Sequence, residues 1–304
     1  MTAPASQRVA HGLRSVQRGV LWNAGLATVK LVAGVVGNTY ALIADAVESM
    51  ADVFTSAIVY QGLRVSARAP DEEYPFGYGK AEALSAAVVA LTLLGAAAGI
   101  AVQAIREIRT PHLAPAPWTL LVLVGVIVVK LTLSRQARGV GVDTGSTAVR
   151  AEALHHLSDA VTSAAAFAGI GLSLVATELW PGTHWESADD WAALLASLVI
   201  AYNGVAIARA AATELMDRAP GQDVIRCIRE AAEGVPGVLA TEKIAVRKAG
   251  VVFRVTLHVQ ASPAMSLHEA HVLGGKVKTA IRSAEPRVDA VLVHLEPFED
   301  GAAA

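Results

Sequence analysis

The chain has 304 residues, of which 54% are hydrophobic, and its mean hydropathy of +0.46 is far above that of an ordinary soluble domain. This composition excludes a wholly soluble protein, because the surplus of apolar side chains must face lipid. The formal net charge is only −2, and the single cysteine, Cys227, excludes an internal disulfide and a zinc site built from cysteines. No nucleic-acid partner is expected.

Six stretches are apolar enough to cross a membrane, which takes about 20 mostly apolar residues. They are residues 19–37, 40–62, 82–104, 117–134, 150–176 and 190–212. After Asp217 such runs end, and helical periodicity alternates with short β-branched segments. The sequence therefore predicts an N-terminal segment over 1–18, a six-helix transmembrane domain over 19–217 and a soluble C-terminal domain over 218–304.

Basic residues predict the orientation of these spans. One side of the membrane receives Arg8, Arg14, Arg18, Arg64, Arg68, Lys80, Arg135, Arg138, Arg209 and Arg218, and the other receives Arg106 and Arg109. The positive-inside rule then places both termini in the cytoplasm of a multi-pass protein of the inner or plasma membrane. The N-terminal stretch lacks a small-residue cleavage site, so no cleaved signal peptide is expected.

An internal repeat carries ionisable residues into two of these spans. Residues 44–57, ADAVESMADVFTSA, align without a gap with residues 151–164, AEALHHLSDAVTSA. The aligned pairs are Asp45 with Glu152, Glu48 with His155, and Asp52 with Asp159. The spacing i, i+3, i+7 places each triplet on one helical face. Because the two spans run in opposite directions, the repeat is inverted, which is typical of transporters with a site near the midplane.

Four of these side chains are predicted to hold a divalent cation at mid-depth: Glu48, Asp52, His155 and Asp159. Each charge at the bilayer centre costs at least about 2.5–3.5 kcal/mol, and a bound cation would offset that cost. Three carboxylates and one imidazole suit tetrahedral Zn²⁺ and also accept Fe²⁺, Co²⁺ or Mn²⁺. Imidazole titrates near neutrality and binds metal only when unprotonated, so protons and metal would compete for the site.

Other interpretations of these residues stay open. Asp52 and His155 could instead form an interhelical hydrogen bond that holds the bundle together. Asp45 and Glu152 lie one turn from the ligand pairs, where they could support the ligands or relay protons. His156 lies on a different face from His155, where core packing or a pore-lining role is expected.

The pairs Glu48/Asp52 and His155/Asp159 resemble the transport site of the cation diffusion facilitator family of divalent-metal exporters, which usually has HxxxD or DxxxD in spans 2 and 5. Glu48 departs from this pattern and lengthens one ligand arm, and His155 speaks against the manganese-type members. The resemblance covers nearly the whole chain. It implies a homodimer that exports a divalent metal, with Zn²⁺ expected, by alternating access in exchange for protons and without an organic cofactor.

The connection PDEEYPFGYGKAEALSA, residues 70–86, resembles the family's HPFGHGKAE signature, with Tyr74 and Tyr78 in place of both histidines. Some members bind a second zinc here, but only Asp71 is left of that site, so it is expected to be empty or weak. The family pairs a lysine, here Lys80, across the dimer with an aspartate after span 6, here Asp217. From the residues alone, Lys80 could equally be a positive-inside anchor.

The C-terminal domain is predicted to have the order α-β-β-α-β, which suits a small α+β sandwich and resembles the family's metallochaperone-like domain. The elements are a helix over 221–234, strands over 242–248 and 252–260, a helix over 266–284 and a strand over 288–296. Ser266 and Glu269 form a capping box that begins the second helix.

The histidines of this domain fall into a pattern. In FRVTLHVQ, alternation places His258 on the polar face of its strand, and His294 and Glu296 share one face of the last strand. By the family resemblance, His258, His271, His294 and Glu296 match positions that bind cytoplasmic zinc, and Glu242 occupies a position that is often histidine. A regulatory metal site is therefore predicted, and surface histidines of no consequence are the alternative.

The sequence thus predicts a transporter and not an enzyme. An exporter of Fe²⁺, Co²⁺ or Mn²⁺ remains open because these ions accept overlapping ligands. A membrane-bound sensor would use the same ligands without moving the metal. An intramembrane metalloprotease is the least favoured class, because the chain has no HExxH motif and a fully ligated site leaves no position for a catalytic water.

Overall fold

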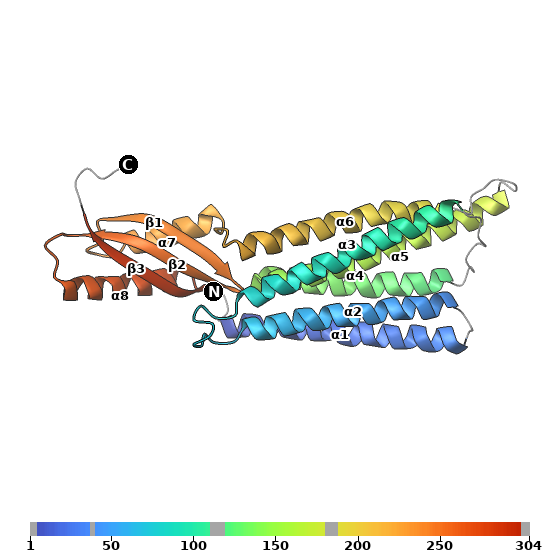
Figure 1. The fold of residues 1–304 in the computed structure, drawn as a ribbon, viewed down its shortest axis with the longest axis horizontal. Coiled ribbons are helices and arrows are strands. Elements are labelled where there is room, and N and C mark those ends of the chain that lie inside the picture. Colours follow the sequence, from blue (N-terminus) through green and yellow to red (C-terminus); the bar gives the residue numbers. More distant parts are fainter. Residues whose placement is uncertain (1–4, 37–39, 110–118, 180–187, 299–304) are drawn as a thin grey trace. The chain divides into compact units, whose positions relative to one another are not determined.

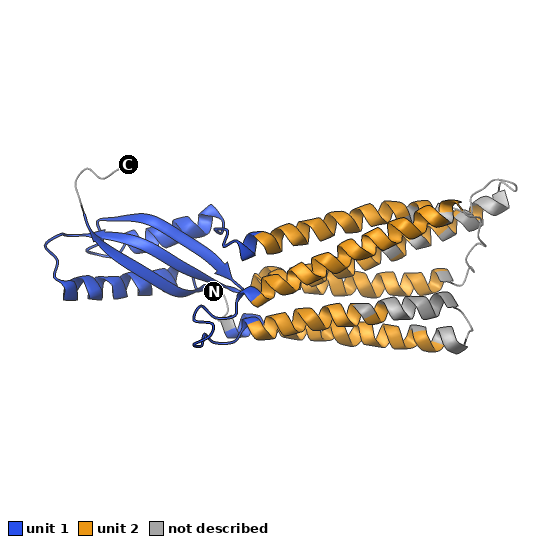
Figure 2. Ribbon diagram, in the orientation of Figure 1, with its two compact units in different colours: residues 1–10, 66–80, 213–304 blue, residues 11–65, 81–212 orange. Residues whose placement is uncertain are grey.

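The computed structural model describes residues 5–36, 40–109, 119–179 and 188–298 (Figure 1). The chain divides into two compact units (Figure 2). We call residues 11–65 and 81–212 the helical unit, and residues 1–10, 66–80 and 213–304 the mixed unit. Each is described by itself below.

Six long helices carry the predicted spans. They are α1 (Ala5–Val36), α2 (Tyr40–Ser66), α3 (Lys80–Arg109), α4 (Thr119–Thr144), α5 (Thr147–Leu179) and α6 (Ala188–Leu215). Most continue past the predicted ends, because charged residues end an apolar run without ending a helix. Thus α4 passes through Arg135 and Arg138, and the chain turns only at Gly145, whose φ of +71° suits glycine.

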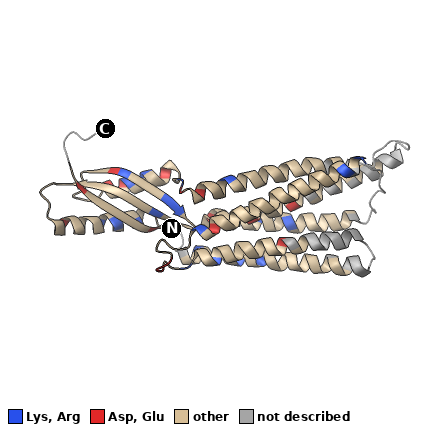
Figure 3. Cartoon of the chain, viewed as in Figure 1, with Lys and Arg blue, Asp and Glu red and all other residues tan. Residues whose placement is uncertain are grey.

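Three stretches of the described helices can cross a membrane by length and composition: Lys80–Arg106, Leu120–Thr144 and Leu194–Leu215. Along the helical unit, Lys, Arg, Asp and Glu occupy isolated positions on helices that otherwise consist of uncharged residues (Figure 3). The fold class is therefore a helical transmembrane domain followed by an α+β domain. The number of spans, six, and the domain limits at 18 and 217 stay predictions.

Small residues form much of the core of the helical unit. Ala86, Ala90 and Ala97 of α3 and Ala148 and Ala151 of α5 are buried in one apolar cluster. Small side chains let helix backbones approach closely, which favours packing between membrane helices. Helices α4 and α5 pack along each other, and this pairing brings Lys130 of α4 beside the polar face of α5.

The α-β-β-α-β order of the C-terminal part is confirmed. Its elements are α7 (Gln222–Glu233), β1 (Ala240–Ala249), β2 (Val252–Ala261), α8 (Leu267–Ala284) and β3 (Val288–Pro297). The sheet has the order β1-β2-β3, with β1 antiparallel and β3 parallel to β2. Strands β2 and β3 are parallel because α8 provides the crossover between them.

The sheet has one buried face and one open face. Val255, Leu257 and Val259 of β2 are buried in the same cluster as Ile228 of α7 and Val277 of α8. The intervening residues of β2 point the other way, which leaves its polar face for a site. The predicted capping box of Ser266 and Glu269 is present and begins α8.

Candidate metal centres

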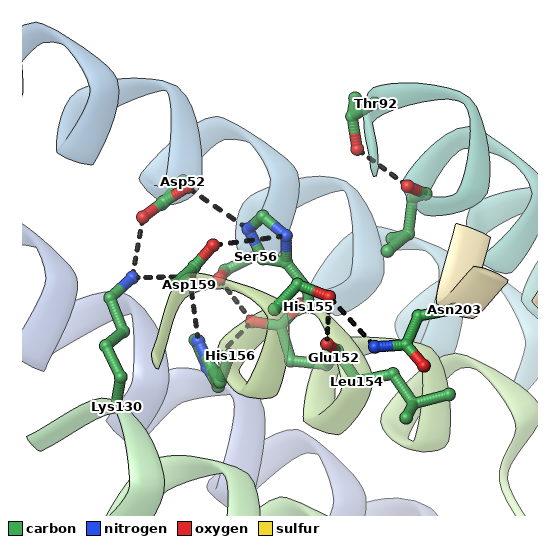
Figure 4. A network of polar contacts seen from close by, with 12 residues as sticks. Asp52, Ser56, Thr92, Lys130, Glu152, Leu154, His155, His156, Asp159 and Asn203 are labelled. Carbon is green, nitrogen blue, oxygen red and sulfur yellow. Dashed lines mark hydrogen bonds and ion pairs between the residues drawn. The ribbon is translucent and has the colours of Figure 1, made fainter. Parts of the chain in front are cut away.

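The first candidate site joins the two copies of the repeat. Asp52 of α2 lies beside His155 and Asp159 of α5 (Figure 4). His155 Nε2 is 3.2 Å from Asp52 Oδ1, and His155 Nδ1 is 4.0 Å from Asp159 Oδ1. One possible ligand atom from each residue lies within 4.8 Å of the others. We call these three residues the transmembrane cluster, and their spacing suits a single bound cation.

The local sequence explains this geometry. On α5, the i, i+4 spacing of His155 and Asp159 places both side chains on one face, one turn apart. Asp52 and His155 are buried within the helical unit. Burial of ionisable groups on otherwise apolar helices is costly unless they are paired or bind an ion.

Lys130 is a fourth member of the site that the sequence analysis missed. Its ammonium group donates to Asp52 Oδ2 at 2.6 Å and to Asp159 Oδ2 at 2.8 Å (Figure 4). Its side chain is only 3% exposed. The available signal was a lone lysine inside the apolar run VGVIVVKLTL of a predicted span, since charges in such runs usually have a function.

A second polar network lies next to the transmembrane cluster. The hydroxyl group of Ser56 donates to the buried carboxylate of Glu152. His156 lies between the two networks, with Nε2 3.4 Å from Glu152 Oε1 and Nδ1 3.9 Å from Asp159 Oδ2. The prediction that Glu152 supports the ligands is compatible with this position, and His156, 1% exposed, is a buried residue of the polar network.

Two predicted residues of the first repeat cannot be placed. Asp45 and Glu48 belong to helix α2, but their side chains lie outside the described residues. Glu48 as a fourth ligand and Asp45 as a supporting group therefore stay predictions.

The second candidate site lies on the open face of the sheet. His258 of β2 is in register with His294 of β3, and their rings are 4.9 Å apart. Glu296 Oε1 is 2.6 Å from His258 Nδ1 and 3.4 Å from His294 Nε2. These three residues, which we call the sheet cluster, also offer ligand atoms within 4.8 Å of one another. Two imidazoles and a carboxylate are ligands that Zn²⁺ accepts.

The two other predicted ligands of this domain lie outside that group. Glu242 of β1 is in register with His258, but its carboxylate is 3.7 Å from Lys243 Nζ. His271 is exposed on α8, which packs on the buried face of the sheet. Within one chain the structure therefore assembles three of the five predicted cytoplasmic ligands.

The loop before α3 is organised by hydrogen bonds. Asp71 accepts the hydroxyl proton of Tyr78 and the N–H of Tyr74, both at 2.7 Å. These bonds, chiefly that from Tyr78, hold the pKa of Asp71 below its ordinary value. The same carboxylate raises the pKa of Tyr78 to about 12. Both oxygens of Asp71 are thus engaged in hydrogen bonds, and the expectation of an empty or weak metal site at this loop stays a prediction.

Lys80 and Asp217 form an ion pair within one chain, with Nζ 3.1 Å from Oδ1. The family resemblance implied that this lysine and aspartate pair between two subunits, whereas here they pair within a single chain. Asp217 also pairs with Arg247 of β1 at 3.3 Å. Both ion pairs are partly exposed, and pairs of this kind contribute little stability by themselves. A role for Lys80 and Asp217 at a dimer interface stays a prediction.

A helical membrane domain with a buried ligand cluster, followed by an α+β domain with a second one, defines a class of metal-handling membrane proteins. Residues 16–216 match the cation efflux transmembrane domain, and residues 220–298 match the cytoplasmic domain of cation efflux proteins. The chain therefore belongs to the cation efflux, or cation diffusion facilitator, family, whose members move divalent metal cations across membranes.

Several characterised proteins are similar over nearly the whole chain. The cation-efflux pump FieF of Cronobacter sakazakii is 30% identical over 93% of each chain. The magnetosome protein MamM of Paramagnetospirillum magneticum is 30% identical over 93% of this chain and 87% of its own. Metal tolerance protein C1 of Arabidopsis thaliana is 28% identical over 94% of this chain, which spans 62% of that protein.

Solved structures of the MamM C-terminal domain also match. A nickel form is 25% identical and covers 26% of this chain and all of its own, with a TM-score of 0.26.

Proposed function

We propose that this family member exports Zn²⁺ from the cytoplasm in exchange for protons, with Glu48, Asp52, His155 and Asp159 as the ligands of the transported ion. The observation that carries the proposal is the transmembrane cluster. A carboxylate from one repeat lies within ligand distance of an imidazole and a carboxylate from the other repeat. Two helices that share one ion can bind it when they approach and release it when they separate.

The ligand chemistry supports zinc as the cargo. Glu48 would complete a set of three carboxylates and one imidazole, and four nitrogen and oxygen ligands match the tetrahedral preference of Zn²⁺. The imidazole of His155 makes the set softer than the all-oxygen ligands that suit Mn²⁺ or Mg²⁺.

Proton coupling follows from the same residues. Carboxylates and imidazole bind metal only when deprotonated, so metal loading releases protons and proton loading releases metal. A site that is alternately open to the two sides would therefore exchange metal for protons whenever a pH gradient is present. Glu152, His156 and, on the other repeat, Asp45 would carry protons to or from the ligands.

The mixed unit would regulate this cycle. Metal at the sheet cluster would involve His258, His294 and Glu296 of one chain. His271 and Glu242 would join them from a second chain of a homodimer. Both termini and this domain would lie in the cytoplasm, as the distribution of basic residues indicates.

Flux measurements test the proposal. The full chain is reconstituted in vesicles with an imposed pH gradient, and uptake of Zn²⁺, Fe²⁺, Co²⁺ and Mn²⁺ is measured for wild type and Asp159→Ala. Asp143→Ala is the matched control, because Asp143 is an exposed aspartate near the end of α4. Gradient-dependent Zn²⁺ uptake that is lost in Asp159→Ala and kept in Asp143→Ala is expected. Uptake of another metal in place of zinc would correct the cargo, and binding without flux for all four ions would favour a sensor.

A further inference from the structure

Lys130 places a positive charge inside the candidate transport site. Its ammonium group bridges the two aspartates, at 2.6 Å from Asp52 and 2.8 Å from Asp159, while His155 faces the other oxygen of each carboxylate. Figure 4 shows the lysine reaching the pair from α4, a helix outside the repeat. The two carboxylates thus already share one cation.

We propose that Lys130 is a tethered counter-cation of the transport site: it offsets one of the two negative charges of the aspartates when no metal is bound, and it weakens the hold on the metal so that the ion can leave. This inference rests on the proposed function, since it assigns a role within the same site. The ammonium and a metal ion compete for the lone pairs of the same two carboxylates.

Burial explains why the metal-free site needs such a cation. Two carboxylates on apolar helices lose their hydration, and the cost of burial is high unless an opposite charge is close. The side chains of Lys130, Asp52 and Asp159 are 3%, 12% and 22% exposed, so water solvates these charges only in part. A lysine on a flexible stem can also withdraw when a metal enters, because its four-carbon chain has several rotatable bonds.

An opposite role for Lys130 would be to orient the carboxylates for the metal. Groups that orient metal ligands typically strengthen binding by about 10–100-fold. Until the lysine withdraws, a divalent ion held by both aspartates would lie within about 5 Å of the ammonium, because the ammonium is 2.6 Å and 2.8 Å from their oxygens and metal–oxygen bonds are about 2 Å long. Even at an effective dielectric constant of about 20, repulsion between a divalent and a monovalent cation at that distance weakens binding by several orders of magnitude. Repulsion therefore outweighs orientation.

The two roles predict opposite effects of removing the charge. Zinc affinity of the full-length protein is measured by titration at about pH 8, where protons compete less than at neutral pH. The His294→Ala background is used so that the sheet cluster contributes less. We expect Lys130→Met and Lys130→Gln to lower the Kd for Zn²⁺ by at least about tenfold and to slow zinc release. Lys130→Arg should stay close to the parent, because it keeps the charge. Lys276→Met is the matched control on exposed surface. Unchanged or weaker binding in both uncharged variants would overturn the proposal.

Thermal unfolding supplies a second measurement if a variant folds poorly. Without metal, the uncharged variants should unfold at a lower temperature than the parent, and Zn²⁺ should raise their Tm by more than it raises the parent's. If Lys130→Met does not fold, Lys130→Gln is measured in its place. Failure of both to fold even with Zn²⁺ present would overturn the proposal, because the metal is expected to replace the ammonium.

The test of Lys130 and the test of the proposed transport function can fail independently of each other. If the wild type binds Zn²⁺ but shows no gradient-dependent flux, transport is refuted, and the affinity shift of the Lys130 variants still decides whether the lysine competes with the metal. If flux is present and the affinity shift is absent, only the role of Lys130 is refuted.

Discussion

The transmembrane cluster and the sheet cluster have nearly the same ligands and very different surroundings. Each combines imidazole and carboxylate groups within 4.8 Å. The His155 and Asp52 side chains are 8% and 12% exposed, and Lys130 pairs with the Asp52 carboxylate. In the sheet cluster the His294 side chain is 62% exposed, and those of His258 and Glu296 are 26% and 25% exposed. A buried set of charges needs a cation built into the fold, and a partly exposed set keeps contact with water.

This difference suggests different tasks. In the proposed mechanism, metal, protons and the lysine would compete around the buried cluster for a small number of carboxylate oxygens, so the site could be loaded and emptied. The sheet cluster is partly open to solvent and built on two neighbouring strands, which hold His258 and His294 in a fixed register. In the same proposal, a site of that kind would sense metal by equilibrium with the surrounding solution.

The largest expected effect is the loss of a ligand from the transmembrane cluster. Asp52→Asn keeps the shape of the side chain and removes its charge, so Zn²⁺ affinity at this site should fall by at least about 100-fold, since even groups that only support metal ligands contribute about 10–100-fold. Proton-driven uptake should fall with it. Titration and vesicle flux are the measurements, and Glu296→Gln in the sheet cluster is the control of the same chemistry. Equal flux in Asp52→Asn and wild type would contradict the assignment of transport to the transmembrane cluster.

Next in size is the loss of a ligand from the sheet cluster. In His294→Ala, the number of zinc ions bound per chain at micromolar metal should fall by one. The sheet cluster keeps only two of its three ligand groups, so its affinity for zinc should fall by about 10–100-fold. Flux at saturating zinc should fall only a few-fold, because the transported ion does not use this residue. His268→Ala, an exposed histidine on α8, is the control. Complete loss of flux in His294→Ala would show that the two clusters do not have separate tasks.

A smaller effect is expected at the start of α5, whose position brings His155 and Asp159 to α2. The buried carboxylate of Glu82 accepts the backbone N–H groups of Thr147 and Ala148. Glu82→Ala leaves those donors unsatisfied, which typically costs about 1–3 kcal/mol of stability. A lower Tm and reduced flux are expected.

Glu72→Ala, at an exposed acidic residue of the preceding loop, is the control for this change. Zinc binding at the sheet cluster should be unaffected in both variants, because that site depends on strand register. A weakened sheet cluster in Glu82→Ala would contradict the separation of the two sites.

The smallest expected effect concerns Asp71, an exposed acidic group held by hydrogen bonds. Tyr78→Phe removes the bond that contributes most to the lowered pKa of Asp71, so this pKa should rise toward its ordinary value, as NMR titration of the carboxyl would show. Tyr74→Phe is the control, since Tyr74 contacts Asp71 through its backbone N–H. An unchanged Asp71 pKa in Tyr78→Phe would contradict the hydrogen bond.

The same pair predicts how the loop responds to pH. The lowered pKa of Asp71 gives stabilisation that is present above its ordinary pKa and is lost as pH falls through the lowered value. The pKa of Tyr78 is raised from 10 to about 12, so its contribution is complete below its ordinary pKa and is lost as pH rises through about 12. Tyrosinate absorbance at pH 11 should therefore be lower in wild type than in a variant that lacks the Asp71 carboxylate.

By itself, the sequence determined the class of fold and indicated most of the candidate ligands of both sites. Apolar runs separated the helical part from the C-terminal part, and alternation in β2 placed His258 on the open face of the sheet. The repeat identified Asp52, His155 and Asp159 as candidate ligands, because local helix geometry places the polar residues of each copy on one face. These features are local or repeated, so periodicity is enough to detect them.

Only the tertiary structure decided which distant residues meet. Lys130 has no counterpart in the repeat, and nothing local indicates that α4 delivers its ammonium to Asp52 and Asp159. Likewise, packing of α8 on the buried face separates His271 from the sheet cluster within one chain. Contacts of this kind depend on how helices pack. Packing brings together side chains that are far apart in the sequence and that no helical or strand periodicity connects.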